Sequence, residues 1–262
     1  MTNKKKLLEI LKKGAELYGF LGTKAEFEAE GTRRNELTEL AILTAKANLE
    51  LTLKIGGCEA VSDLFDARIF GANTIVAPMV ESAYSLKKYS EAAQKVFSED
   101  ELKDTKILYN LETDEAFRAK EKIIEMSKTG MINGIVFGRV DYSYSMNRSR
   151  SEINSSEITN DILTISHLAK ENDLILTVGG GINEDSVPHL QKIKQIRLDR
   201  FETRKIVFDS EILNSKNICE ALSLAFEFEL LWLESKASEY SKMASEDSLR
   251  IKMLKQRFSK LN

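Results

Sequence analysis

The chain has 262 residues, of which 42% are hydrophobic and 30% charged, and its formal net charge is −3. These values are typical of a globular protein with a full core, and the lack of a basic surplus argues against nucleic acid as the main partner. No apolar run approaches the roughly 18 residues that a membrane helix needs. The two cysteines, Cys58 and Cys219, are far apart in the sequence, which indicates a reduced, cytoplasmic protein.

The first expected element is an amphipathic helix over about residues 3–17, with Leu7, Leu8 and Leu11 near one stripe. The N-terminal segment is basic, but it has no long apolar stretch and no small-residue cleavage site, so it does not resemble a signal peptide. A role at a membrane surface is the less favoured interpretation of this helix, and we expect no membrane partner.

Short strand-like segments then alternate with longer helical ones. We expect strands at 22–29, 50–55, 73–79, 106–112, 134–139, 174–179 and within 196–208, and helices near 34–48, 58–70, 83–97, 113–129, 157–171 and 183–193. This order, with apolar strands, predicts parallel strands covered by helices. An eighth strand comes either from a segment near Tyr18 or from a split of the last stretch. We therefore predict an α/β fold, a (β/α)8 TIM barrel, rather than an open doubly wound sheet.

The first predicted strand contains the segment "KAEFEAEGTR", residues 24–33. Its alternation places four ionisable side chains on one face of an extended chain, those of Lys24, Glu26, Glu28 and Glu30. Such a row suits either a solvent-facing edge strand or the inner rim of an active site. A closed barrel has no edge strand, which favours the rim.

The C-terminal part of the chain, about residues 216–262, predicts additional helices. The segment 217–240 carries apolar residues on more than one face, and a second helix is expected to begin at the capping signal of Ser245 and Asp247. These helices either close the outer ring of the barrel or form the interface of a homo-oligomer. With two prolines and no Pro- or Ser-rich linker, residues 1–262 are expected to form a single domain.

The carboxyl ends of the predicted strands carry polar residues or glycine, and this is the end of a TIM barrel where active sites lie. The candidates in chain order are Glu26, Glu28, Lys54, Glu81, Glu112, Arg139, Asp141, Gly179, Gly180, Glu202 and Arg204. Because each follows an apolar strand that must be buried, we expect an enzymatic or ligand-binding site there.

Several carboxylates that converge on one barrel mouth repel each other unless a cation lies among them. Oxygen ligands favour Mg²⁺ or Mn²⁺, and the two histidines, His167 and His189, lie in helical or loop patterns that offer no zinc site. The glycines of "VGGGIN" either form a plain tight turn or allow backbone N–H groups to approach a phosphate or carboxylate.

At "GANTIVAPMVESAYSLKKY" and in the segment from "ILYNLET" to "GRVDYSYSMN", the chain resembles the HpcH/HpaI aldolase/citrate lyase family, over roughly residues 20–210. The resemblance implies a barrel that handles pyruvate-like compounds. It also implies that Glu112 of "LET" and Asp141 of "GRVD" are the protein ligands of a divalent metal ion.

Two departures from the family pattern bear on the reaction. Aldolases of the family usually have a histidine at the first strand for proton transfer, and this sequence has "EFEAEG" there. They also have an arginine at the second strand that holds the substrate, where this chain has Lys54, which cannot repeat a bidentate contact. Arg139 is expected to replace that arginine in part.

The leading hypothesis is a metal-dependent carbon–carbon lyase, or aldolase, that acts on a 2-oxo acid or a related acyl substrate. Glu112 and Asp141 would hold Mg²⁺ or Mn²⁺, and Lys54 and Arg139 would add positive charge at the substrate oxygens. Glu28, Glu81 or a metal-bound water is expected to transfer the proton. Contacts with the substrate are expected from the remaining candidates, which are Glu26, Gly179, Gly180, Glu202 and Arg204.

Two alternatives stay open. Lys24, Lys54 and Lys205 lie on strands, where a lysine can form a Schiff base, although ion pairing with the nearby glutamates is the simpler interpretation. A barrel without the proton-transfer histidine could also bind a 2-oxo acid or a phosphorylated ligand without cleaving it, or catalyse a transfer in sugar or acyl metabolism.

Overall fold

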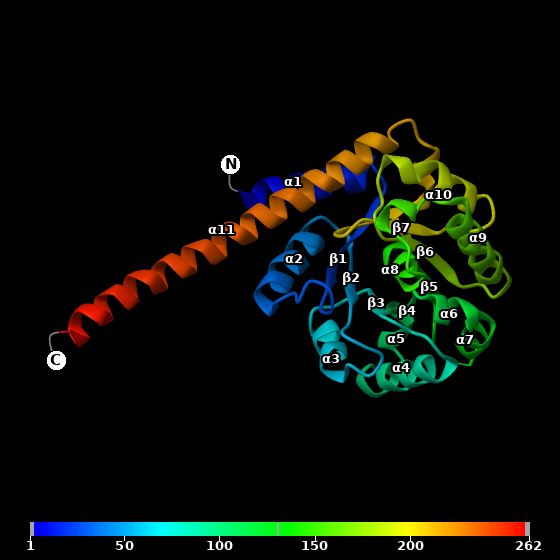
Figure 1. The fold of residues 1–262 in the computed structure, drawn as a ribbon, viewed down its shortest axis with the longest axis horizontal. Coiled ribbons are helices and arrows are strands. Elements are labelled where there is room, and N and C mark those ends of the chain that lie inside the picture. The colour runs from blue at the N-terminus through cyan, green and yellow to red at the C-terminus, as the bar shows by residue number, and fades with distance from the viewer. Residues whose placement is uncertain (1–2, 130, 260–262) are drawn as a thin grey trace.

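Eight strands close into a barrel in the order of the sequence, which confirms the predicted TIM-barrel architecture (Figure 1). The computed structural model describes residues 3–129 and 131–259. The strands are β1 (Phe20–Glu26), β2 (Glu50–Lys54), β3 (Thr74–Ala77), β4 (Lys106–Leu111), β5 (Gly134–Gly138), β6 (Ile175–Gly179), β7 (Arg200–Glu202) and β8 (Ile206–Asp209). The first seven run parallel, as expected for strands joined by helical crossovers.

The eighth strand arises from the split of the last stretch, and its direction differs from the prediction. β8 is antiparallel to both of its neighbours, β7 and β1. Only Thr203, Arg204 and Lys205 separate β7 from β8, and so short a connection can make a hairpin but not a parallel crossover. The hairpin turn therefore lies at the carboxyl end of β7, beside the expected site.

Helices surround the barrel and bury the outward faces of the strands (Figure 1). They are α2 (Arg34–Lys46), α3 (Val61–Ile69), α4 (Ala83–Val96), α5 (Glu101–Asp104), α6 (Asp114–Arg118), α7 (Lys120–Ser127), α8 (Arg139–Ser145), α9 (Ser156–Glu171) and α10 (Val187–Lys194), with short 3-10 turns η1 (Arg150–Glu152), η2 (Glu184–Ser186) and η3 (Ser210–Asn214). The helix expected at 113–129 is divided into α6 and α7. The sequence did not predict α8, which begins directly at the end of β5.

The inside of the barrel is filled at its N-terminal end. Glu50 accepts hydrogen bonds from Lys106 at 2.9 Å and from Arg200 at 3.1 Å, and all three are the first residues of their strands. Above this ion cluster lies a small apolar layer made of Val76, Leu108, Val136 and the partly buried Ile175. Within the barrel interior, the described residues therefore leave space for a ligand toward the carboxyl ends of the strands.

The N-terminal helix α1 (Asn3–Leu17) agrees with the prediction and packs against the long C-terminal helix α11 (Ile218–Phe258). The two helices expected in the C-terminal part are a single helix of 41 residues, so the predicted start at Ser245 and Asp247 is wrong. The Ser245 hydroxyl donates to the carbonyl of Ser241 one turn earlier, inside the helix, instead of capping a new one. No helix among those described is both long enough and apolar enough to span a bilayer.

Candidate active site

A cavity of about 340 Å³ opens at the carboxyl ends of the strands, where the sequence predicted a site. Nine of the eleven candidate residues line it, namely Glu26, Glu28, Lys54, Glu112, Asp141, Gly179, Gly180, Glu202 and Arg204. Residues that are distant in the sequence meet here because each follows a different strand of one closed sheet.

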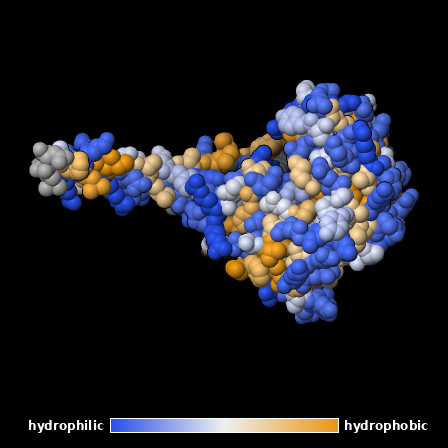
Figure 2. Space-filling model, turned by 60° about the horizontal axis from the view of Figure 1, so that its bottom comes forward, coloured by the Kyte–Doolittle hydropathy of each residue, from blue (hydrophilic) through white to orange (hydrophobic). Residues whose placement is uncertain are grey.

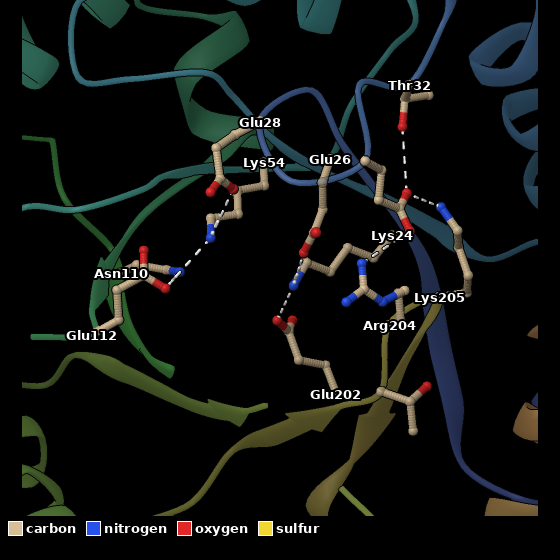
Figure 3. A network of polar contacts seen from close by, with 12 residues as sticks. Lys24, Glu26, Glu28, Thr32, Lys54, Asn110, Glu112, Glu202, Arg204 and Lys205 are labelled. Atoms are coloured by element: carbon tan, nitrogen blue, oxygen red, sulfur yellow. Dashed lines mark hydrogen bonds and ion pairs between the residues drawn. The ribbon is translucent and has the colours of Figure 1, made fainter. Parts of the chain in front are cut away.

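Lys24 lies at the centre of the first ion cluster of the cavity (Figure 3). Its ammonium group is 2.8 Å from Oε1 of Glu26 and also donates to Glu202, and all three side chains are buried. Burial by itself would lower the pKa of Lys24, but the charges and hydrogen bonds of Glu202 and Glu26 outweigh it and raise this pKa. Burial likewise opposes ionisation of Glu26, yet Lys24 and the nearby Lys54 and Arg204 lower the pKa of that carboxyl group. Lys24 is therefore held as a cation between two carboxylates.

Lys54 occupies a second cluster, between Glu28 and Glu112 (Figure 3). Its Nζ atom lies 3.2 Å from Oε2 of Glu28 and 3.4 Å from Oε2 of Glu112. Glu112 is almost fully buried, and this burial, together with the charge of Asp141, raises its pKa despite the opposing charge of Lys54. A second carboxylate in the same cavity repels the buried carboxylate of Glu112. Additional positive charge beside these two groups is therefore favourable.

The local sequence holds Glu112 in place. Asn110 is two residues earlier on the same face of β4, and its amide donates to Oε2 of Glu112 at 2.5 Å. The backbone N–H of Met79 donates to Oε1 at 3.0 Å, and Met79 has a φ of 50°, an unfavourable value for a residue with a side chain. At Gly138 a Cβ atom would lie 2.7 Å from Oε2 of Glu112, so glycine is needed there.

The segment "KAEFEAEGTR" is strand only as far as Glu26, and the rest turns across the mouth of the barrel. Glu28 pairs with Lys54 on one side, and Glu30 pairs with Lys205 on the other. The nearest Arg204 nitrogen lies 3.7 Å from Glu30. The acidic row therefore belongs to the rim of the cavity and not to a solvent-facing edge.

Two expected residues lie elsewhere. Arg139 begins α8 with its guanidinium group buried behind the glycine turn, where it donates to the carbonyls of Gly179 at 3.3 Å and Gly180 at 2.8 Å and to Asn154 at 2.8 Å. Burial lowers the pKa of Arg139 to about 10. It positions the turn and does not face the substrate. Glu81 is exposed and outside the cavity lining, because the chain turns away after β3.

The cavity also contains residues that the sequence analysis missed as site residues. Asn110 could have been found by its two-residue spacing from Glu112 on β4. Arg150 follows α8, and Phe226 and Glu229 come from α11, and all three line the cavity. The sequence carries no pattern that ties these three positions to a barrel mouth, because only the tertiary fold brings them there.

The residues present fit a hard divalent cation. Glu112 and Asp141 offer carboxylate oxygens in one cavity, and Oδ1 of Asn110 is buried without a hydrogen-bond partner among the described residues. Those residues hold no group of three or more His, Cys, Asp or Glu side chains arranged for a metal. Mg²⁺ is commonly bound by one or two carboxylates and keeps several waters, which agrees with this donor set.

Comparisons with known proteins agree with this architecture. A family model described as HpcH/HpaI aldolase/citrate lyase matches residues 32–187. An HpcH/HpaI aldolase from Desulfitobacterium hafniense is similar, with 12% identity, 78% of this chain and 83% of that chain covered, and a TM-score of 0.61.

An HpcH/HpaI aldolase/citrate lyase family protein from Burkholderia cenocepacia is 11% identical to this chain, with 76% of this chain and 83% of that chain covered and a TM-score of 0.59. A variant of the citrate synthase SbnG is 14% identical, with 85% of this chain and 88% of that chain covered and a TM-score of 0.57. At these identities the structures support the fold and not a reaction. No curated protein matches the sequence.

The Lys24 cluster predicts a strong effect of removing its cation. Lys24→Met leaves two buried carboxylates without a counter-charge, so we expect the free energy of unfolding at neutral pH to fall by about 3–5 kcal/mol. The raised pKa of Lys24 means that its contribution persists up to pH values above the usual lysine range and is lost only as the pH rises through that raised pKa. Urea unfolding at several pH values measures both effects.

The same unfolding experiment, extended to acidic pH, also tests the role of Glu26. The lowered pKa of Glu26 gives stability that is present above its unfolded value and is lost as the pH falls through the folded value. The difference in the free energy of unfolding between wild type and Lys24→Met should therefore become smaller as the pH is lowered. Lys87→Met removes the cation of an exposed ion pair on α4 and is the matched control. It should change the free energy of unfolding little. Equal stabilities of Lys24→Met and wild type at neutral pH would contradict this account.

Proposed function

Because this chain belongs to the HpcH/HpaI aldolase/citrate lyase family, a family of lyases, we propose that it cleaves a carbon–carbon bond of a 2-oxo acid with the help of a divalent metal ion. The observation that carries the proposal is the presence of Glu112 and Asp141 in one cavity, with Lys54 beside them. Substrates of this class carry a carboxylate and a neighbouring keto oxygen, and both suit a cationic site.

Glu112 and Asp141 are the residues that would hold Mg²⁺ or Mn²⁺. When bound, the ion supplies positive charge that stabilises the negative charge developing on the keto oxygen of the substrate. Asn110 and the Met79 N–H fix the Glu112 carboxylate before the ion arrives, so little reorganisation is needed.

Lys54 and Glu28 supply the remaining chemistry of the proposal. In a 4-hydroxy-2-oxo acid, Glu28 takes the proton of the 4-hydroxyl group, and the bond between C3 and C4 breaks to release an aldehyde. The electron pair moves to the enolate of the pyruvate-like fragment, whose oxygen Lys54 faces, and the proton from Glu28 then returns to C3. Glu28 has a side-chain exposure of 32%, so it is more accessible than Glu112.

The contacts of the lysines favour this mechanism over a Schiff base. A nucleophilic amine must lose its proton, and the two carboxylates around Lys24 raise its pKa. Lys205 is paired with Glu30 and is not part of the cavity lining. Lys54 is also paired with carboxylates, which agrees with an electrostatic role.

Arg150 points to an additional anionic group on the substrate. Among the described residues it makes no ion pair, whereas Lys24, Lys54 and Arg204, the other cations of the cavity, each do. It lines the cavity near Gly181, whose φ of 64° belongs to the tight turn after β6. A second carboxylate or a phosphate on the substrate suits this corner.

A second candidate function rests on the missing histidine of the first strand. A barrel that offers Glu26 and Glu28 in its place could bind a 2-oxo acid or a phosphorylated ligand without cleaving it, or catalyse a transfer reaction. The two functions differ in whether a 4-hydroxy-2-oxo acid is consumed.

We expect Glu112→Gln to lower the release of pyruvate from 4-hydroxy-2-oxo acids by more than about 100-fold, because the site loses one of its two carboxylates. Release is followed by coupling pyruvate to lactate dehydrogenase, with Mg²⁺ or Mn²⁺ present and after EDTA treatment. Glu115→Gln, an exposed carboxylate three residues later on α6, is the control and should keep full activity.

Three outcomes would overturn the proposal. Full activity of Glu112→Gln, or of wild type in EDTA, contradicts the metal assignment. A borohydride-trapped adduct with pyruvate that survives EDTA establishes the Schiff base instead. Wild type that binds pyruvate but consumes none of a panel of 4-hydroxy-2-oxo acids favours the second candidate function.

Arg150→Gln should raise KM by roughly 10- to 100-fold for substrates with a second anionic group and leave kcat nearly unchanged, because this arginine binds the part that does not react. Arg148→Gln is the control, since Arg148 lies nearby in sequence but pairs with Glu157 outside the cavity. Equal KM values for Arg150→Gln and wild type would show that Arg150 does not bind the substrate.

A further inference from the structure

The second half of α11 extends away from the barrel (Figure 1). The last side-chain hydrogen bond with the body of the protein is that of Tyr240, whose hydroxyl donates to Glu36 and whose ring lies 4.3 Å from the Arg33 guanidinium group. After Tyr240, the side-chain hydrogen bonds and ion pairs of the described residues stay within the helix. The 18 residues from Ser241 to Phe258 therefore form an arm of about 27 Å.

A heptad pattern of apolar residues runs along this helix. Steps of four and three residues alternate without a break through Phe226, Leu230, Leu233, Ala237, Tyr240, Ala244, Asp247, Ile251, Leu254 and Phe258, which we call the seam. Asp247 is the one charged member. Such spacing over 33 residues is the pattern of a helix that pairs with another helix.

The seam lies mostly on the solvent side of α11. The residues that pack on the protein body, such as Leu231 and Trp232, occupy the other side of the helix. Leu230 is 60% exposed, Leu254 61% and Phe258 68%. Apolar residues are visible along the arm in Figure 2. Large apolar side chains exposed in a row on a helix mark an interaction surface.

The charges beside the seam indicate the direction of the partner helix. Seam-flanking positions carry Glu227, Glu229, Glu234 and Lys236 in the first half of the helix, and Arg250, Lys255 and Arg257 in the second half. An antiparallel copy places Glu227 near the partner's Lys255 and Glu229 near the partner's Arg257, with Lys236 near the partner's Arg250 as a like-charge exception. A parallel copy places Glu229 near the partner's Glu234 and Arg250 near the partner's Lys255, so that like charges lie together.

We propose that α11 pairs with α11 of a second copy of this chain in an antiparallel coiled coil whose two-fold axis passes near Lys242. In this register Leu230 faces the partner's Leu254, and Leu233 faces the partner's Ile251. The side-chain hydrogen bonds with the body of the protein end at Tyr240, just before this axis, so the two barrels lie at opposite ends of the helix pair.

The pairing also brings the arm of one copy to the site of the other. In the same register the partner's Phe258 faces Phe226, and the partner's Arg257 faces Glu229. Phe226 and Glu229 both line the candidate active-site cavity. In this proposal, the α11 pair is the interface of the homo-oligomer expected from the sequence. Each arm covers one edge of the cavity in the other copy.

Analytical ultracentrifugation of the full chain tests the interface. Wild type should sediment as a dimer at micromolar concentration, and the seam variant Ile251→Glu/Leu254→Glu as a folded monomer with an unchanged near-UV spectrum. Leu249→Glu/Met253→Glu changes two equally exposed residues of the arm outside the seam and should stay dimeric. A monomeric wild type, or equal effects of the two double variants, would falsify the proposal.

Disulfide cross-linking tests the direction. In a background of Cys58→Ser/Cys219→Ser, chains with Leu233→Cys and chains with Ile251→Cys are mixed and oxidised. The antiparallel register predicts disulfides between position 233 of one chain and position 251 of the other, identified by peptide mass spectrometry. A parallel pair would give only 233–233 and 251–251 disulfides, which would overturn the register. Neither measurement depends on the catalytic proposal.

Discussion

The architecture of the barrel mouth depends on buried lysines that neutralise buried carboxylates. Lys24 lies between Glu26 and Glu202, and Lys54 lies between Glu28 and Glu112. Removing charge from water is costly, and these groups are tolerated because each cation has two anionic neighbours, which lie on or just after different strands. The same pairs tie β1, β2, β4 and β7 together at the end of the barrel where a ligand would bind.

Charge balance also explains how the site can take up further charge. The cavity holds more carboxylates than the lysines of its two clusters neutralise. Burial raises the pKa of Glu112, and the charge of Asp141 adds to this effect. A hard cation at these two oxygens relieves that repulsion. Arg150, which lines the same cavity near Gly181, leaves a place for an anionic group. A 2-oxo acid with a second negative group satisfies both requirements.

The parts of this fold that the sequence predicted are those with a strong local pattern. Apolar strands followed by amphipathic helices predicted the barrel, and carboxylates directly after strands predicted most of the cavity lining. The direction of β8 was missed, although the three residues between β7 and β8 allow only a hairpin once the strand boundaries are known. Arg139 was misplaced because position after a strand does not reveal that its side chain turns back to the Gly179–Gly180 carbonyls. Arg150 and Phe226 reach the cavity through tertiary packing, which leaves no local signal.

In our proposal, Glu112 and Asp141 form a site for a divalent cation, and Lys54 is its neighbour. Titration with Mn²⁺, followed by electron paramagnetic resonance, measures this directly in wild type and in Lys54→Met. The account predicts one bound Mn²⁺ per chain, and an affinity at least about tenfold higher in Lys54→Met, because the lysine charge opposes the dication at the same carboxylate. Absence of bound Mn²⁺ from both proteins would contradict it.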